Sequence, residues 1–435
     1  MRSIHKSPLA PLVLAVVIGL LLGRRWAGSG TPDLEALSAP LVPALEDGPN
    51  GVERRVADGA ALLAWARADD PIVVVQNRTD ALPNELALKA VPLLVDWMAS
   101  KDHDHYVVRN VNVACDPLLA TTTLATVHVP KEGIRSVEFV FVQDRKYGRS
   151  MHSGHGLLRF VFEPTSRPSV VVPDETAWTG PETLDDLLVS FEAWREPGVG
   201  FDFVAGLTPD SYSITVRAYA GSAYYLQTAL KQFQWQCYPL DLSASGATGE
   251  GLLEICLKIG DGLMRRVLAE MFESGELQVP TPEALRGWTA DDEERVVALL
   301  RDDMVPDDAI RSIVGRADLS YHLIARSCMS MTMAVIDLTQ RRAADRSGGT
   351  YVPLAVAPKE LPAWLGELPT AGRADMLAML PGAVVWLAKN QNVVPSNAWR
   401  ILRDGGLLRT ADGAVVRHDY VPEGVTPWGR IAENL

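Results

Sequence analysis

The sequence lacks most of the motifs by which enzymes are recognised. Its 435 residues include four cysteines, none in a C-x-x-C pair, so neither a zinc ribbon nor a thioredoxin-type site is indicated. There is no G-x-S-x-G, no G-x-x-x-x-G-K-[ST], and no G-x-G-x-x-G after a strand. The sequence therefore gives no motif for serine acyl transfer, nucleotide binding or dinucleotide binding, and no cofactor is predicted.

Basic residues are also scarce. Lys and Arg total 41 against 54 Asp and Glu, a formal net charge of −13. Residues 1–30 hold four of the basic side chains and no acidic one, so the remainder carries 37 against 54, or −17. Because nucleic acids and anionic membrane surfaces attract cations, neither is an expected partner. A helix-then-hairpin order near the C-terminus is typical of winged helices, but the arginines there are too few for DNA binding.

The cysteines themselves are ambiguous. An even count permits two disulfides in an oxidising compartment, whereas apolar surroundings such as LLEICLKI favour buried free thiols. The four residues are Cys115, Cys237, Cys256 and Cys328.

An apolar N-terminal segment is the clearest feature that is present. Residues 8–23 (PLAPLVLAVVIGLLLG) carry no charge. As a helix they span about 24 Å, short of the roughly 30 Å hydrocarbon core, so a cleaved signal peptide and a membrane anchor both fit. Arg24, Arg25 and Trp26 favour an uncleaved anchor. Arg2, Lys6 and the terminal amine outweigh Arg24 and Arg25 by one charge, which favours export of the bulk of the chain; a short helix in a soluble core is the remaining alternative.

Composition divides the chain into six parts. A Pro-, Gly- and Ala-rich stretch follows the leader, and a Ser- and Gly-rich stretch near 241–251 separates strand-rich from helix-rich sequence. The predicted parts are a signal-anchor or signal peptide (1–26), a linker (27–54), a first α/β module (55–150), a second α/β module (151–244), a helical domain (250–345), and C-terminal helices with a hairpin (346–435).

Strand and helix patterns alternate in the first module. IVVVQN, YVVRNVNVAC and RSVEFVFVQ are typical of strands, while NELALKAVPLLVDWMAS (84–100) and PLLATTTLATVHV (117–129) are interpreted as helices. The second module repeats the order, with PETLDDLLVSFEAW (181–194) and SAYYLQTALKQFQWQ (222–236) as its helices. The fold class predicted is therefore α/β, with tandem small βαβαβ modules followed by a mainly α-helical C-terminal domain.

Matching residues support an internal duplication. PNEL and PETL each open a predicted helix, LLV recurs at 93–95 and 187–189, and Trp97 corresponds to Trp194. Tyr106 and Tyr212 each begin a middle strand. The alternative is a single α/β domain whose elements are merely alike.

The C-terminal half shows helical periodicity. Apolar residues recur every three or four positions in GLLEICLKIGDGLMRRVLAEMFESG and SYHLIARSCMSMTMAVIDLTQRR. Three methionines in the second stretch, Met329, Met331 and Met333, are interpreted as core fillers. Asp412-Gly413 predicts the turn of a hairpin, and SGATGEG (245–251) is interpreted as a linker because it has no phosphate-binding lysine.

Two histidine pairs are the candidate metal ligands. KDHDHY contains His103 and His105, and MHSGHG contains His152 and His155. A metal centre requires three or four converging ligands, so these could form one only if the two loops met in space. The alternative to a metal centre is that both histidine pairs simply lie on exposed loops. Catalytic residues are not identified by the sequence.

One stretch has a familiar pattern. YVVRNVNVACDPLLATTTLATVHVPKEGIRSVEFVFVQ resembles, with the N-terminal anchor, the periplasmic half of ExbD/TolR-type biopolymer transport proteins over residues 55–144. The resemblance implies envelope topology and a small α/β module suited to protein contacts. That family has an aspartate in its transmembrane helix, which residues 8–23 lack, so proton coupling is not implied.

The sequence thus favours a membrane-anchored, envelope-facing binding or scaffold protein. It would be single-pass through residues 8–23, exported to a periplasmic or extracellular side, and would contact envelope proteins or itself. The competing hypothesis is a secreted or anchored metal-dependent hydrolase that uses the His103/His105 and His152/His155 loops.

Overall fold

The computed structural model describes the larger part of the chain between residues 54 and 422. The described residues are 54–56, 72–76, 93–116, 121–144, 154–172, 178, 180–194, 212–229, 233–273, 320–321, 327–354, 378–379, 381–382, 385 and 398–422. In this part of the chain no helix is both long and apolar enough to span a membrane. The predicted leader at 8–23 lies outside the described residues. So do the helices that the sequence predicts for ADGAALLAWARADD (57–70), TADDEERVVALLRDD (289–303) and VPDDAIRSIVGRAD (305–318).

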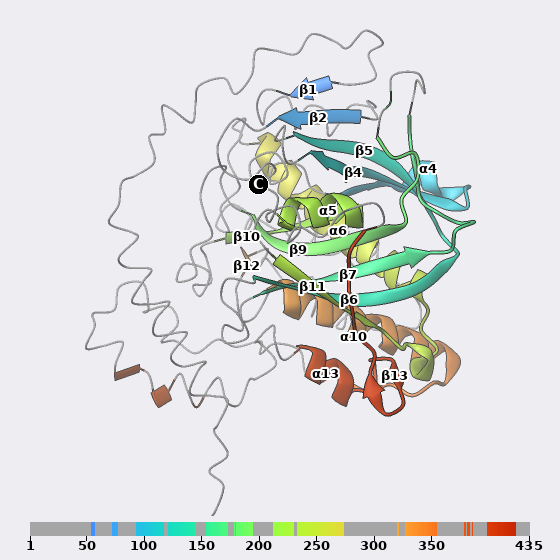
Figure 1. The fold of residues 1–435 in the computed structure, drawn as a ribbon, viewed down its shortest axis with the longest axis vertical. Helices are drawn as coiled ribbons and strands as arrows, with labels where there is room; N and C mark the ends of the chain where they lie inside the picture. The colour runs from blue at the N-terminus through green and yellow to red at the C-terminus, as the bar shows by residue number, and fades with distance from the viewer. Residues whose placement is uncertain are drawn as a thin grey trace, which may run out of the picture.

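A 13-stranded, mostly antiparallel sheet is the centre of the fold (Figure 1). Its order is β1-β2-β5-β4-β10-β9-β7-β6-β11-β15, with β3, β8 and β12 attached at the side. The strands are β1 (Arg54–Val56), β2 (Ile72–Gln76), β3 (Leu94–Asp96), β4 (His105–Asp116), β5 (Thr121–Pro130), β6 (Ile134–Asp144), β7 (Gly154–Phe162), β8 (Ser169–Val170), β9 (Asp186–Trp194), β10 (Tyr212–Tyr219), β11 (Phe233–Pro239), β12 (Ser320–Tyr321) and β15 (His418–Asp419). Mixed α/β architecture is therefore confirmed.

Three predicted helices are wholly or partly wrong. The segments predicted as helices at 117–129 and 181–194 contain the strands β5 and β9. Among the described residues of the helix predicted at 84–100, Leu94–Asp96 form β3, and the helix α4 (Trp97–Lys101) begins at Trp97. The physical reason is alternation: Leu187, Val189 and Phe191 are completely buried on one face, a period of two rather than 3.6.

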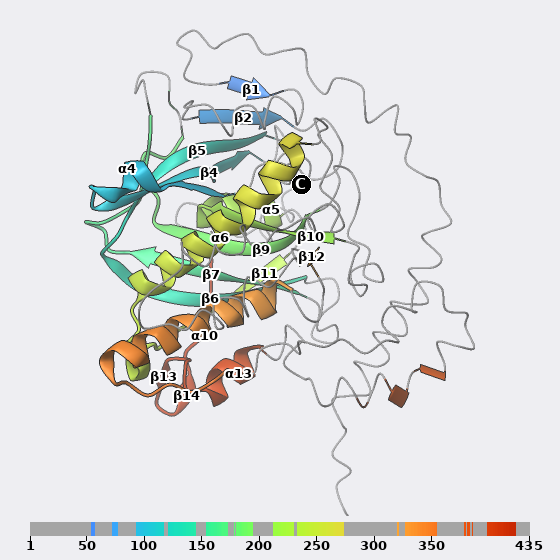
Figure 2. The ribbon, with the colours of Figure 1, turned by 180° about the vertical axis from the view of Figure 1, so that it is seen from behind.

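The remaining helices cover the two faces of the sheet. α6 (Gly249–Glu273) and α10 (Cys328–Ser347) lie on one face, called here the inner face, and α5 (Gly221–Ala229) lies on the opposite, outer face (Figures 1 and 2). α13 (Ala398–Asp404) follows nearer the C-terminus. The predicted helices at 251–275 and 320–342 are confirmed for the most part, although 320–321 form β12. The start of the helix predicted at 222–236 is confirmed as α5, but its last residues, 233–236, belong to the strand β11.

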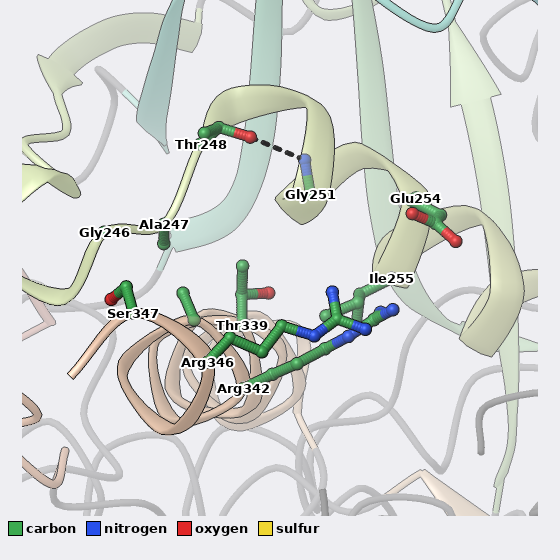
Figure 3. Close-up of a pocket in the computed structure, with 11 residues that line it drawn as sticks. Gly246, Ala247, Thr248, Gly251, Glu254, Ile255, Thr339, Arg342, Arg346 and Ser347 are labelled. Atoms are coloured by element: carbon green, nitrogen blue, oxygen red, sulfur yellow. Dashed lines mark hydrogen bonds between the residues drawn. The ribbon is translucent and has the colours of Figure 1, made fainter. Parts of the chain in front are cut away.

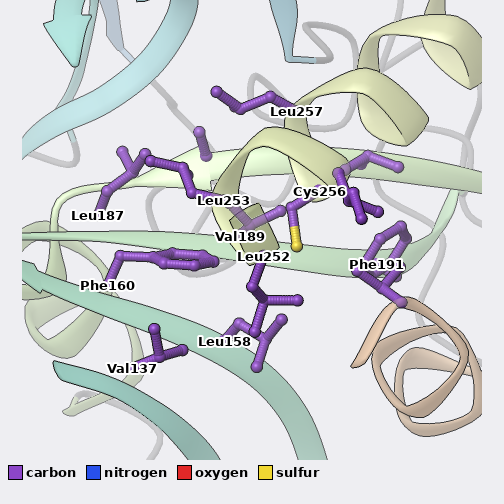
Figure 4. Close-up of a cluster of buried hydrophobic side chains, with 14 of the residues drawn as sticks. Val137, Leu158, Phe160, Leu187, Val189, Phe191, Leu252, Leu253, Cys256 and Leu257 are labelled. Carbon is purple, nitrogen blue, oxygen red and sulfur yellow. The ribbon is translucent and has the colours of Figure 1, made fainter. Parts of the chain in front are cut away.

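The core lies between α6 and the inner face of the sheet. Leu158, Phe160 and Val189 meet Leu252 and Cys256 of α6 (Figure 4). Because α6 is apolar on the face that meets the sheet, this packing removes large side chains from water and positions both layers. The three methionines of α10 are buried, as predicted for core fillers.

Strands from the two predicted modules alternate within the one sheet. β4, from residues 55–150, pairs with β10, and β6 lies between β7 and β11 from residues 151–244. α6 and α10 pack against this same sheet. The Asp412-Gly413 hairpin is confirmed, with β13 (Thr410–Ala411) pairing with β14 (Ala414–Val415). All four cysteines are free and buried.

Candidate functional site

The outer face of the sheet is unusually polar for a buried surface. Antiparallel pairing in register places Arg159 beside Glu138 and Ser190 beside Arg217, and all four are at most 8% exposed. Helix α5 lies over this face (Figure 1). Buried polar groups are costly unless they have partners, and clusters of such groups are typical of functional sites. This face is therefore the first place to look for a reaction site.

Strands β7 and β9 separate at one end of this face. Their pairing stops at Leu158 and Val189, although β7 begins at Gly154 and β9 continues to Trp194. Helix α10 contacts both strands. The separation leaves room for the N-terminal end of α10 to approach the backbone of β7.

The sequence Gly-His-Gly at the start of β7 permits this approach. A side chain at Gly156 would collide with Met329 Sδ of α10, and one at Gly154 would collide with the Phe141 ring. His155, between them, points to the opposite face by strand alternation. Glycine is therefore required at positions 154 and 156 on the inner face, and the His155 imidazole lies on the polar outer face.

His155 lies near Cys328, the first residue of α10, and the charges of the two side chains affect each other. The helix is capped by Ser327, whose side chain accepts a hydrogen bond from Ser330 N. A helix N-terminus stabilises negative charge, so the thiolate form of Cys328 is favoured by its position. The thiol is 3% exposed, and the His155 side chain retains 23% exposure.

Opposite charges outweigh burial at this pair. Burial opposes ionisation of Cys328, but the adjacent His155 and the Gly156 N–H stabilise the thiolate and lower the pKa of the thiol. Burial likewise opposes the imidazolium, yet Cys328 and Glu192 raise the pKa of His155. The two shifts have opposite signs and describe a thiolate–imidazolium pair.

Two side chains of β9, Ser190 and Glu192, contact the His155 imidazole. His155 Nε2 lies 2.6 Å from Ser190 Oγ and 3.9 Å from Glu192 Oε1. Glu192 is itself held by Tyr219, whose hydroxyl donates over 3.0 Å, and by Arg217 NH1 at 3.6 Å. Burial raises the pKa of Glu192, but Arg217 and His155 lower it more, so the carboxylate is charged.

Tyr321 of β12 completes the surroundings of the thiol. Its hydroxyl and the Cys328 thiol affect each other's pKa, which places the tyrosine near the sulfur. Tyr321 pairs with Tyr212, the first residue of β10, so it lies at the start of that strand. The tyrosine hydroxyl is therefore a hydrogen-bond donor near the sulfur.

The predicted histidine ligands are not brought together. His103 and His105 stack at 5.0 Å between ring centroids, and His105 stacks on His128 at 4.2 Å. His155 has the different surroundings described above, and His152 lies outside the described residues. His155 was therefore singled out by sequence, although as a metal ligand.

A second polar cluster occupies the other end of the outer face. Arg159 Nε donates to Asp186 Oδ2 over 2.6 Å, and Arg159 NH1 donates to Glu138 Oε2 over 2.8 Å. The Tyr420 ring lies over the guanidinium at 4.2 Å. Among the described residues, one group of three metal-ligating side chains is found, Glu138, Cys237 and His418, and it adjoins this cluster.

The glycine-rich stretch predicted as a linker forms one wall of a pocket of about 280 Å³. The pocket lies between the first turn of α6 and the last turns of α10, and Arg342 and Arg346 extend along it (Figure 3). Thr248 caps α6 by accepting from Gly251 N over 3.1 Å. No histidine or cysteine lines this pocket, so it does not compete with the Cys328–His155 pair as a reaction site.

Sequence reasoning missed Cys328, Glu192 and Tyr321. The available signals were weak: a Ser-Cys dipeptide at the start of a long helical pattern, and a histidine between two glycines in a strand. Cysteine and histidine partners are adjacent in space rather than in sequence, so no spacing rule connects them. Compared with known proteins, the chain matches no family model, no curated protein and no solved structure.

Proposed function

We propose that the chain is a cysteine-dependent acyl-transfer enzyme that cleaves ester or amide bonds. Cys328 is the nucleophile, His155 the general base and acid, and Glu192 the residue that holds His155. The proposal is supported by one arrangement: a buried thiol at a helix N-terminus, near a histidine whose ring lies 3.9 Å from the Glu192 carboxylate. Thiolate, imidazolium and carboxylate recur in this order in nucleophilic cysteine sites.

The residues perform the two half-reactions as follows. The Cys328 thiolate attacks the carbonyl carbon, a thioester forms, and the departing alcohol or amine takes the proton from the His155 imidazolium. Water then attacks the thioester while neutral His155 accepts its proton, which releases the acid and restores the thiolate–imidazolium pair. Glu192 stabilises the positive charge of His155 in both resting and product states.

A donor for the developing oxyanion is present near the sulfur. The Tyr321 hydroxyl lies near the thiol, and the tyrosine remains protonated because burial and the adjacent Cys328 raise its pKa. Fixed donors aimed at a developing negative charge typically contribute 10²–10³-fold in rate. Tyr321 acts in this step as a hydrogen-bond donor.

The test is acylation of the purified full-length chain by p-nitrophenyl acetate. We expect release of p-nitrophenolate with one acetyl group on Cys328, located by mass spectrometry of the peptides. Cys328→Ala should abolish this acetylation, and His155→Gln should slow it. Cys256→Ser is the matched control, since Cys256 is also buried but burial alone raises its pKa, so its loss should leave acylation unchanged.

Two results would contradict the proposal. One is equal acetylation of the wild type and Cys328→Ala, which would locate the reaction elsewhere. The other is an unmodified Cys328 under conditions in which unfolded protein reacts. Circular dichroism of each variant establishes that the fold is intact, so that loss of labelling is not mistaken for unfolding.

A binding or scaffold role is the second candidate function. It is supported by the acidic composition and by the apolar leader at residues 8–23, which together favour an exported, single-pass protein that contacts envelope proteins or itself. The resemblance to ExbD/TolR-type proteins supports the same setting. Fractionation with a protease-accessibility assay tests it: degradation of the chain from the cytoplasmic side alone would reject export.

We also propose that the sheet arose by duplication of a smaller unit. Support comes from Tyr106 and Tyr212, which correspond in sequence and lie near the starts of β4 and β10, two strands that pair in parallel. A helical C-terminal domain is likewise a proposal, which expression of residues 250–345 alone would test through its far-ultraviolet circular dichroism.

A further inference from the structure

Three neighbouring strands bring a carboxylate, a thiol and an imidazole to one point. Glu138 lies on β6, Cys237 on β11 and His418 on β15, and Cys237 is directly paired with His418. One potential ligand atom from each lies within 4.8 Å of the other two. His418 Nε2 is 2.9 Å from Glu138 Oε1.

These atoms match the ligand set that zinc-class ions prefer. Tetrahedral Zn²⁺ binds sulfur at about 2.3 Å and nitrogen or oxygen at about 2.0–2.2 Å, which sets ligand atoms roughly 3.3–3.6 Å apart. The observed separations, 2.9 Å between His418 Nε2 and Glu138 Oε1 and at most 4.8 Å between any two of the three atoms, bracket that spacing. Mixed sulfur, nitrogen and oxygen ligands favour Zn²⁺ or Co²⁺ over Mg²⁺ or Ca²⁺, which take oxygen.

Hydrogen bonds around Glu138 determine which of its two oxygens faces Cys237 and His418. Glu138 Oε2 accepts from Arg159 NH1, so Oε1 is left toward Cys237 and His418. Arg159 is anchored by Asp186, whose Oδ1 accepts from Gly221 N at the start of α5 over 2.7 Å. Hydrogen bonds that orient a ligating carboxylate in this way are a regular feature of metal sites.

Charge balance gives a second, independent argument. Two buried carboxylates, Glu138 and Asp186, face one guanidinium, Arg159, which leaves a formal charge of −1 when the thiol and the imidazole are neutral. Addition of a divalent cation with ionisation of Cys237 brings the formal charge to zero. Since an uncompensated buried charge is strongly disfavoured, the cluster gains by binding a cation.

We propose that Glu138, Cys237 and His418 bind a divalent transition-metal ion of the zinc class, with a fourth position open to water. The ion enters beside His418, whose side chain is 43% exposed, while Glu138 and Cys237 are buried. A thiol binds such an ion as the thiolate, so binding releases one proton from Cys237.

The ion would also attach the C-terminal segment to the sheet. β15 joins β11 through only two residue pairs, Gln236 with Asp419 and Cys237 with His418. A metal bridge from His418 to Glu138 and Cys237 crosses three strands at that junction. Metal-loaded protein should therefore unfold at a higher temperature than metal-free protein.

Co²⁺ is the probe, because thiolate-bound Co²⁺ gives a charge-transfer absorption that oxygen and nitrogen ligands do not. We expect one equivalent of Co²⁺ to produce this band in the metal-free full-length chain, with displacement by Zn²⁺ and release of one proton. Cys237→Ser should remove the band, and His418→Ala should weaken Co²⁺ binding at least about tenfold, as expected when one of three protein ligands is lost.

Two matched variants separate this site from the other candidates. Cys328→Ala removes the proposed nucleophile and should leave the band intact, so failure of the metal site and failure of the enzyme proposal are distinguishable. His105→Ala removes an exposed histidine of the His103–His105–His128 stack and should leave Co²⁺ stoichiometry at one.

The proposal is overturned if the wild type shows no charge-transfer band, or if the band persists in Cys237→Ser. Retention of the band in Cys237→Ser with loss in Cys328→Ala would assign the ion to the Cys328–His155 pair instead. Should Cys237→Ser fail to fold, the His418→Ala comparison decides, because His418 is near the surface and its loss leaves the core intact.

Discussion

Cys328 and Cys237 are both buried thiols next to a histidine, yet their surroundings give them opposite acidity. At Cys328 the facing histidine is held as a cation by Glu192, and the pKa of the thiol falls. At Cys237 burial and the Glu138 carboxylate raise it. The comparison shows that the nearest charge, rather than burial or the presence of a histidine, decides whether a buried thiol is ionised.

The same difference separates the two proposed roles. A thiolate at rest can attack an electrophile, whereas a protonated thiol becomes a ligand only when a metal displaces its proton. Each thiol therefore has a histidine and a glutamate nearby: His155 and Glu192 near Cys328, and His418 and Glu138 near Cys237. Four measurements can break or sharpen this contrast.

Arg159→Met should have the largest effect. It leaves Glu138 and Asp186 buried without their cation, and removal of one partner of a buried pair costs about 3–5 kcal/mol. Chemical denaturation measures the loss. The control is Arg167→Met, whose pair with Asp185 is exposed, 42% and 59%, and should be worth less than about 1 kcal/mol. Equal losses in both variants would mean that the cluster is not a buried, charge-balanced unit.

His155→Gln should slow acetylation of Cys328 by p-nitrophenyl acetate by about 100-fold at pH 7, the lower end of general-base contributions. Glutamine retains hydrogen bonding to Ser190 but cannot carry the positive charge that stabilises the thiolate. Stopped-flow release of p-nitrophenolate measures the rate. His105→Gln is the control and should match the wild type; an unchanged rate in His155→Gln would remove the imidazole from the mechanism.

The pH dependence of alkylation should distinguish the two thiols. Because the pKa of Cys328 is lowered, a larger fraction of it stays ionised as pH falls from 8.5 to 7, so its rate with iodoacetamide should fall less than that of an ordinary thiol. In His155→Gln the thiol loses that shift, and the rate should fall roughly 16-fold over the same interval, as for an ordinary pKa near 8.5. Mass spectrometry resolves Cys328 from Cys237, which should stay unreactive throughout.

His418→Ala should have the smallest effect when metal is absent. Its contact with Glu138 is partly solvent-exposed, so the loss should be about 0.5 kcal/mol in chelator-treated protein. With Zn²⁺ added, the same substitution should remove the whole metal-dependent rise in unfolding temperature. A large loss without metal would instead make the histidine a structural cation for the cluster.

Much of the sheet was predictable, and the errors have one cause. Runs such as IVVVQN, YVVRNVNVAC and RSVEFVFVQ are strands because β-branched and aromatic residues fit a pleated surface. LLVSFEAW and TTTLATVHV were predicted as helices because leucine and alanine satisfy a spacing of three or four as well as two. Which period applies depends on what each face packs against, here α6 on one side and polar groups on the other.

The candidate site was less predictable than the fold. The sequence indicated His155 as a candidate metal ligand, and its expected partners were histidines on a second loop. Its actual neighbours, Ser190, Glu192 and Cys328, come from another strand and from a helix on the far face of the sheet.

By itself, the sequence determined the acidic charge, the turn at Asp412-Gly413 and several elements, among them the strands β2, β4 and β6 and the helices α6 and α10. These follow from residue types and local propensity. Only the tertiary structure decided which thiol is ionised. Acidity depends on charges within a few ångströms, and that neighbourhood was created by the separation of β7 from β9 and by the close packing that Gly154 and Gly156 permit.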